Sequence, residues 1–147
     1  MPDYISVMRI LIALAVLATP ATAWEFTASP VCTVTHETPD GDLTLTYDPR
    51  QPEPYAIAVT SAVPWPNAPV FGMRFDGPRA LTITTDRQTL DGQTLTVRDQ
   101  GFGNVLNGLE FNETATALLG DTALSFPLDD AAPEIQRFRA CLVTPIA

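Results

Sequence analysis

The side chains that could carry chemistry in the first part of this chain gather around its only histidine. His36 is followed closely by Glu37, Asp40 and Asp42. Imidazole and carboxylate groups can bind zinc or calcium, but a metal site holds its ligands in a fixed geometry. The two aspartates lie on a turn that provides no such geometry. We interpret His36 as the end of a strand beside an acidic turn, and we predict no metal site and no cofactor.

Covalent catalysis finds little support in the residue types. A Ser–His–Asp triad would have to use His36 with Ser61 or Ser125, and neither serine lies in a G-x-S-x-G frame. The chain has no lysine, which excludes a Schiff base and a phosphate-loop lysine. Glu110 and Glu113 are close in sequence and leave open a hydrolase that uses carboxylates alone. We predict no catalytic residues.

The first residues have the pattern of a signal peptide. Met8 and Arg9 precede an apolar run over residues 10–18, and Ala21-Thr22-Ala23 has the small residues of a cleavage site. The run is much shorter than the roughly 20 residues that span a membrane. We predict a signal peptide over residues 1–23, with Met8 as the alternative start. Residues 24–147 then form a single periplasmic or secreted domain without a membrane anchor.

The two cysteines of an exported chain are typical of one disulfide. Cys32 and Cys141 lie at opposite ends of the folded part, and no C-x-x-C motif indicates a redox pair. A bridge between them would close a loop of about 100 residues, for which the chain-entropy model gives about 4.7 kcal/mol. We predict a structural disulfide that joins the first strand to the last helix.

Two aromatic residues are candidates for contact with a partner. Trp65 lies between two prolines and Phe102 between two glycines, so both belong to loops. Aromatic side chains exposed on stiff loops make good contact anchors. The alternative is that both side chains fold inward and close the ends of a sandwich.

Most of the chain has the pattern of strands that carry these residues. Apolar side chains alternate with threonines at residues 43–47, 81–84 and 94–97, which is typical of half-buried strands. Further strands are expected at residues 31–36, 55–59, 70–75 and 123–127. Residues 114–119 are expected to form a short helix. Residues 105–111 have an ambiguous pattern and are expected to be extended near their end. We predict a mainly β fold, an antiparallel β-sandwich or open barrel with a short helix and a C-terminal helix.

The C-terminal helix has the clearest pattern. Ala131, Ile135, Phe138 and Leu142 recur at helical spacing and predict one apolar face. The preceding pair, residues 129–130, is acidic and is expected to cap the helix N-terminus.

The strand register raises one conflict. A two-residue turn at Asp91-Gly92 would pair residues 81–84 with residues 94–97 so that their leucines face opposite sides, which a half-buried sheet does not tolerate. We therefore expect a three-residue loop with a bulge, or irregular residues 86–88.

The stretch from Thr114 to Cys141 reads A-L-L-G-D-T-A-L-S-F-P-L and then an alanine-rich helix that ends in cysteine. This pattern resembles the small exported bacterial proteins of the invasion-associated locus B type. Those proteins have a signal peptide, an all-β domain and a closing helix, strand and helix. The resemblance implies a periplasmic or surface accessory protein without established catalysis.

The net charge of the chain limits the classes of partner that it can bind. A formal net charge of −9 repels phosphate backbones and anionic lipid, so nucleic acid and membrane surfaces are disfavoured. We predict an exported, soluble binding or accessory module for an unknown protein or small ligand. The alternatives are an inhibitor of an exported enzyme, acting through the Trp65 or Phe102 loop, and the carboxylate-dependent hydrolase.

Overall fold

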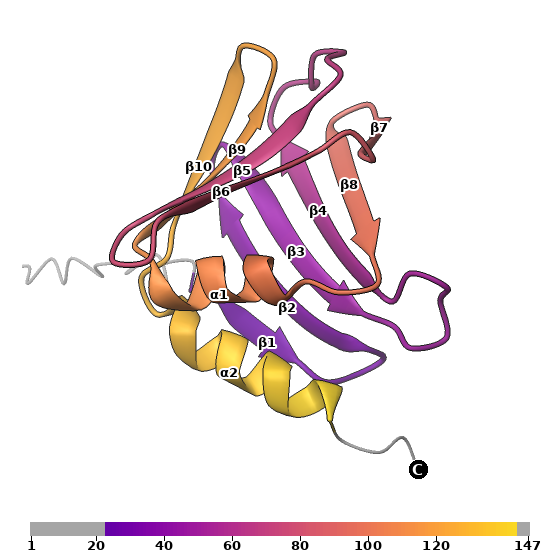
Figure 1. Ribbon diagram of the computed structural model, residues 1–147, viewed down its shortest axis with the longest axis vertical. Coiled ribbons are helices and arrows are strands. Elements are labelled where there is room, and N and C mark those ends of the chain that lie inside the picture. Colours follow the sequence, from indigo (N-terminus) through magenta and orange to yellow (C-terminus); the bar gives the residue numbers. More distant parts are fainter. Residues whose placement is uncertain (1–22, 144–147) are drawn as a thin grey trace, which may run out of the picture.

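The computed structural model describes residues 23–143 and has ten strands and two helices in this part of the chain (Figure 1). The elements are β1 (Glu25–Thr27), β2 (Cys32–Thr38), β3 (Gly41–Tyr47), β4 (Tyr55–Ser61), β5 (Phe71–Asp76), β6 (Leu81–Thr85), β7 (Thr89–Asp91), β8 (Thr94–Asp99), α1 (Gly103–Phe111), β9 (Thr114–Leu119), β10 (Thr122–Pro127) and α2 (Ala131–Leu142).

The strands form two antiparallel sheets. The first sheet has six strands in the order β1-β2-β3-β4-β8-β7, and the second has four in the order β10-β9-β5-β6. Helices α1 and α2 lie across the lower end of the two sheets (Figure 1). The predicted class, a mainly β sandwich with a short helix and a C-terminal helix, is confirmed.

The alternating pattern builds the inner face of the first sheet. Val34, Leu45, Ile57 and Val97 lie next to one another across β2, β3, β4 and β8. All four side chains are buried, whereas the threonines between them are partly exposed. Because side chains alternate along a strand, this register places every apolar set on the core side.

The segment expected to be a short helix is a strand. Residues 114–119 form β9, which lies between β10 and β5 and is largely buried on both faces, so its sequence does not alternate. Gly120 has a φ of 56° and opens a two-residue loop to β10. A glycine at the first loop position is a hairpin signal, and it was interpreted as the end of a helix.

The short helix occurs instead at residues whose pattern was ambiguous and whose end was expected to be extended. Gly103–Phe111 form α1, which buries Leu106 and Leu109 against the sheets. A Cβ atom on Gly108 would lie 2.4 Å from Cδ2 of Phe75, so the ring packs directly on the helix backbone. The close approach explains a glycine inside a helix, where it is otherwise unfavourable.

The register conflict disappears because the two alternating segments belong to different sheets. Strand β6 pairs with β5, whereas β8 pairs with β4 and with the short strand β7. The expected hairpin between residues 81–84 and 94–97 is therefore wrong. The irregular residues 86–88 are present, and they carry the chain from one sheet to the other.

Helix α2 closes the domain with the predicted apolar face. Ala131, Ile135 and Phe138 are buried. Asp130 occupies the N-cap position, but its φ of 61° is left-handed and its side chain makes no capping hydrogen bond, so the predicted cap is corrected. Arg139 Nε donates a 2.8 Å hydrogen bond to Glu110 and thereby joins α2 to α1.

A buried tryptophan lies near the start of the described chain. Trp24 is 3% exposed, and its Nε1 donates a 2.9 Å hydrogen bond to the carbonyl of Pro127. The predicted signal peptide lies outside the described residues, except for Ala23 at its end. Among the helices in the described range, neither has the length and apolar character needed to cross a membrane.

Candidate functional site

The predicted disulfide is present and defines one end of the molecule. Cys32 and Cys141 are bonded, with Cα atoms 6.1 Å apart and a sequence separation of 109 residues. Cys32 begins β2 and faces Tyr47 at the end of β3. The bond therefore holds the last turn of α2 against the ends of two neighbouring strands.

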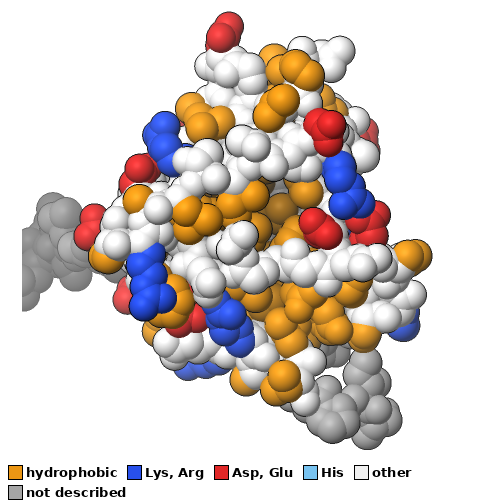
Figure 2. Space-filling view, in the orientation of Figure 1, with side chains coloured by type: hydrophobic (Ala, Val, Ile, Leu, Met, Phe, Trp, Pro, Cys, Tyr) orange, Lys and Arg blue, Asp and Glu red, His pale blue; other side chains and the backbone are white. Residues whose placement is uncertain are grey.

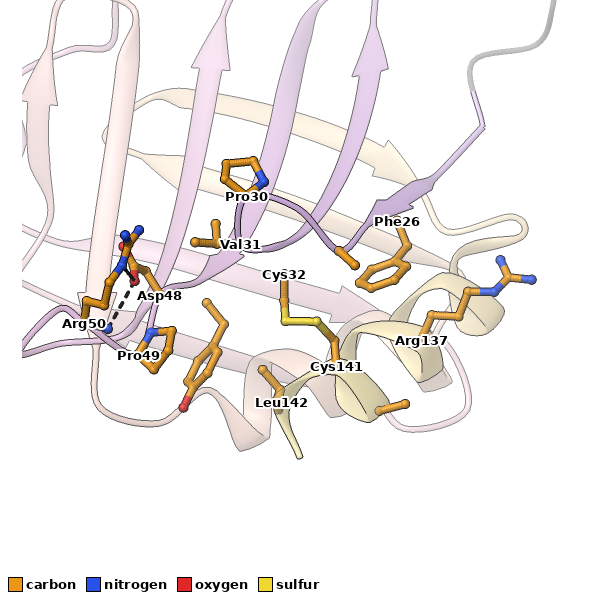
Figure 3. Close-up of a pocket in the computed structure, with 13 residues that line it drawn as sticks. Phe26, Pro30, Val31, Cys32, Asp48, Pro49, Arg50, Arg137, Cys141 and Leu142 are labelled. Carbon is orange, nitrogen blue, oxygen red and sulfur yellow. Dashed lines mark hydrogen bonds and ion pairs between the residues drawn. A yellow bond between two sulfur atoms is a disulfide. The ribbon is translucent and has the colours of Figure 1, made fainter. Parts of the chain in front are cut away.

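A groove of about 700 Å³ lies around this disulfide (Figure 3). Its walls are the β1–β2 connection, the segment that follows β3 and the last turns of α2. Figure 2 shows hydrophobic side chains gathered near the C-terminal end of α2. Most of the lining is apolar and includes Phe26, Pro30, Val31, Tyr47, Pro49 and Leu142.

Arg50 and Asp48 form an ion pair at one end of the groove. Nε of Arg50 lies 3.0 Å from Oδ1 of Asp48, and both residues line the groove. The hydrogen bond from Arg50 is the main cause that lowers the pKa of the Asp48 carboxyl. The same hydrogen bond raises the pKa of Arg50. This end of the groove therefore has no net charge.

Arg137 lies at the other end of the groove (Figure 3). It pairs with Glu134 one turn earlier on α2, and Glu134 does not line the groove. The second carboxylate oxygen of Glu134 accepts a 3.1 Å hydrogen bond from the backbone N–H of Phe26. Glu134 thus fixes the helix to β1 and holds the two walls of the groove together.

An aromatic row leads from the groove toward the side of the sandwich. The rings of Tyr47 and Tyr55 have centroids 4.8 Å apart, and those of Tyr55 and Phe102 are 5.5 Å apart. Burial is the main cause that raises the pKa of Tyr55. At the far end of the row, Phe102 lines a second groove of about 470 Å³ between the two sheets, beside β6 and β8.

The two aromatic residues predicted as partner contacts are both turned inward. Trp65 is 6% exposed, and its Nε1 donates a 3.0 Å hydrogen bond to the carbonyl of Val59. Phe102 is 5% exposed. Neither side chain is therefore exposed for contact with a partner. The alternative prediction, that both side chains fold inward, agrees with the structure.

The residues weighed for catalysis are not brought together. His36 is 5% exposed beneath Trp24, and within residues 23–143 its Nδ1 has no hydrogen-bond partner. Ser61 Oγ accepts from the backbone of Val63, and Ser125 Oγ shares a hydrogen bond with Thr116. In these contacts neither serine is hydrogen-bonded to a histidine that could act as its base.

The carboxylates and the metal candidates are likewise dispersed. Glu110 is bound by Arg139, and Glu113 is exposed on the far side of Asn112. Across the described residues, no group of three or more histidine, cysteine, aspartate or glutamate side chains could hold a metal ion.

Comparison with known proteins adds no relative. No family model, no curated protein and no solved structure matches the chain. The resemblance to the invasion-associated locus B type remains a prediction.

Sequence reasoning found the disulfide but not the groove around it. Phe26, Arg50 and Arg137 come from three distant segments, and no spacing along the chain connects them. The available signal was the predicted disulfide, because it places the residues next to Cys32 beside those next to Cys141.

Proposed function

We propose that the protein is an exported binding module whose ligand lies in the groove around the disulfide. The size of the groove carries this proposal, because its volume of about 700 Å³ falls within the range of small-molecule sites. Such sites have mostly apolar walls with a few polar groups that orient the ligand. The groove has this composition, with Asp48, Arg50 and Arg137 among its apolar residues.

The walls of the groove are held in place before any ligand arrives. The disulfide fixes the end of α2 to β2, and Glu134 fixes α2 to β1. A site that is already ordered loses less conformational entropy when it binds, which favours affinity. These two restraints support a binding role for this end of the molecule.

The other two functions have less support. The inhibitor hypothesis depends on exposed aromatic loops, and Trp65 and Phe102 are buried. A carboxylate-dependent hydrolase needs two carboxyl groups beside its substrate. Among the residues that the structure describes, Asp48 is the one carboxylate that lines the large groove, and it is bound by Arg50.

The experiment is a calorimetric titration of the purified, disulfide-bonded protein with 1-decanol, a neutral apolar probe. We expect saturable binding to the parent. Ala28 is exposed and lines the groove, so Ala28→Trp should fill the groove and abolish binding. The matched control is Ala62→Trp, at an exposed position that does not line the groove, and it should bind as the parent does.

Absence of binding to the parent would overturn the proposal. Equal binding by the two tryptophan variants would also overturn it, because the ligand would then lie elsewhere.

A further inference from the structure

We propose that the groove is specific for a single-chain carboxylate, with the carboxylate at Arg137 and the apolar chain lying over the disulfide toward Leu142 and Tyr47. The inference rests on the proposed binding function and adds the chemical class of the ligand and its direction in the groove. Three observations support it: the charge of the lining, the direction of α2, and the hydrogen-bond donors that remain on Arg137.

The lining of the groove has more arginine than acid, although the molecule is acidic. The chain carries a formal net charge of −9, yet among residues 23–143 the lining has two arginines and one acidic residue. An apolar ligand with an anionic group is the complement of such a surface. A cationic or neutral ligand would form no ion pair with the arginines of the lining.

The two arginines differ in what surrounds them. Asp48, the partner of Arg50, lines the groove itself, so an anion at this end would meet a carboxylate. Glu134, the partner of Arg137, lies outside the lining, with one oxygen bound to the backbone of Phe26. At the Arg137 end the paired acid therefore lies outside the lining, so an anion in the groove would meet the guanidinium group and not a carboxylate of the lining.

The direction of α2 also favours the Arg137 end of the groove as the place of the ligand carboxylate. Figure 3 shows Arg137 beyond Phe26 on one side of the disulfide, and Leu142 on the other side. Leu142 is the last residue of the helix, whose C-terminal carbonyl groups carry partial negative charge. An anion is repelled there, whereas an apolar chain is not. The ligand should therefore point its carboxylate away from the helix end.

Arg137 keeps donors for a ligand. A guanidinium group has five N–H donors, and the ion pair recorded for Arg137 joins its Nη1 to Glu134. Its side chain is 61% exposed. Arginine binds carboxylates through two parallel hydrogen bonds, which are stronger than bonds between neutral groups.

The test compares decanoate, 1-decanol and decylamine by calorimetry on the disulfide-bonded protein. We expect decanoate to bind about tenfold more tightly than decanol, the ratio that one charged hydrogen bond gives. Arg137→Gln should lower the affinity for decanoate to about the affinity that the same variant has for decanol. The matched control is Arg98→Gln, at an exposed arginine that does not line the groove, and it should retain the preference. Added salt at 0.5 M should weaken the binding of decanoate and not of decanol.

Equal affinity of the parent for decanoate and decanol would overturn the inference and leave the binding function standing. Loss of the preference in Arg50→Gln but not in Arg137→Gln would overturn the assigned direction. Binding to phosphatidylglycerol vesicles without binding to monomeric decanoate would show a membrane surface as the partner and contradict the proposal. Failure of all three probes would instead contradict the binding function itself.

Discussion

Trp24 and His36 form one stacked contact that holds the start of the described chain on the core. Their ring centroids are 4.5 Å apart, with an interplanar angle of 6°. Phe126 from β10 packs against the edge of the imidazole at 6.3 Å. Burial lowers the pKa of His36, while hydrogen bonding to the backbone of Ala23 and the charge of Asp42 oppose it. The neutral imidazole is therefore the form that the folded protein favours.

The lowered pKa of His36 predicts a loss of stability in mild acid. In the unfolded chain the imidazole takes up a proton below about pH 6.5, and in the folded state it does so only at lower pH. Stability from this group is complete above pH 6.5 and is lost as the pH falls through the folded-state value. Urea unfolding between pH 7.5 and 5 should show this fall in the parent.

The control for this prediction is His36→Phe, which keeps a ring against Trp24 and cannot titrate. The difference in unfolding free energy between parent and variant should change with pH in the direction that favours the variant in acid. A difference that stays constant over the whole range would contradict the account of His36.

Gly108 permits the closest contact between α1 and the second sheet. Gly108→Ala would force a methyl group into the ring of Phe75, and overpacking of this kind costs about 1–3 kcal/mol. Gly103→Ala lies in the same helix with open space around it and should change the unfolding free energy by less than about 0.5 kcal/mol. Both are measured by urea unfolding, and equal stabilities of the two variants would contradict the contact.

At the scale of elements, α2 joins parts of the chain that are far apart in sequence. Its apolar face covers the core. Arg139 forms a hydrogen bond to α1, Glu134 accepts a hydrogen bond from β1, and Cys141 forms the disulfide to β2. Each of these contacts joins α2 to a segment at least 29 residues away in sequence.

Removing the disulfide should destabilise the domain and loosen the groove. The double variant Cys32→Ala/Cys141→Ala should lose about 2–5 kcal/mol of unfolding free energy, since the unfolded chain regains the freedom of a long loop. The parent unfolded in dithiothreitol should match the variant. An unfolding free energy within about 0.5 kcal/mol of the oxidised parent would show that the bond does not stabilise this fold.

The sequence was most informative where one face of an element is exposed. Residues 43–47 and the face of α2 alternate or repeat clearly, and the structure has both as expected. The pattern failed at residues 105–119, where α1 and β9 are covered by neighbours on most sides. Burial on both faces removes the periodic signal, and the choice between helix and strand then depends on tertiary contacts such as that of Gly108 with Phe75.

The candidate site was less predictable than the fold. The pairing of Cys32 with Cys141 followed from the number of cysteines and the predicted export, and it is present. Whether Trp65 and Phe102 point outward depends on partners such as the Val59 carbonyl and the ring of Tyr55. Those partners are set by the packing of loops onto strands, which no local pattern specifies.

At the scale of the whole molecule, two openings in the described part of the chain differ in their walls. One is the groove between α2 and the first sheet, and the other is the smaller groove between the two sheets beside β6 and β8, where no ladder joins them. The row from Tyr47 through Tyr55 to Phe102 lies between these openings. The larger groove combines an apolar lining with arginines at both ends, whereas the floor of the smaller one is made of core residues such as Ile57 and Met73.

A titration of ¹⁵N-labelled, disulfide-bonded protein with decanoate, followed by NMR, tests the central claim most directly. We predict saturable shifts of the amide signals of Phe26, Cys32 and Leu142, with the signals of Val97 and Phe102 unchanged. Shifts confined to Val97 and Phe102 would place the ligand between the sheets, and no saturable shift at either groove would contradict a binding site around the disulfide.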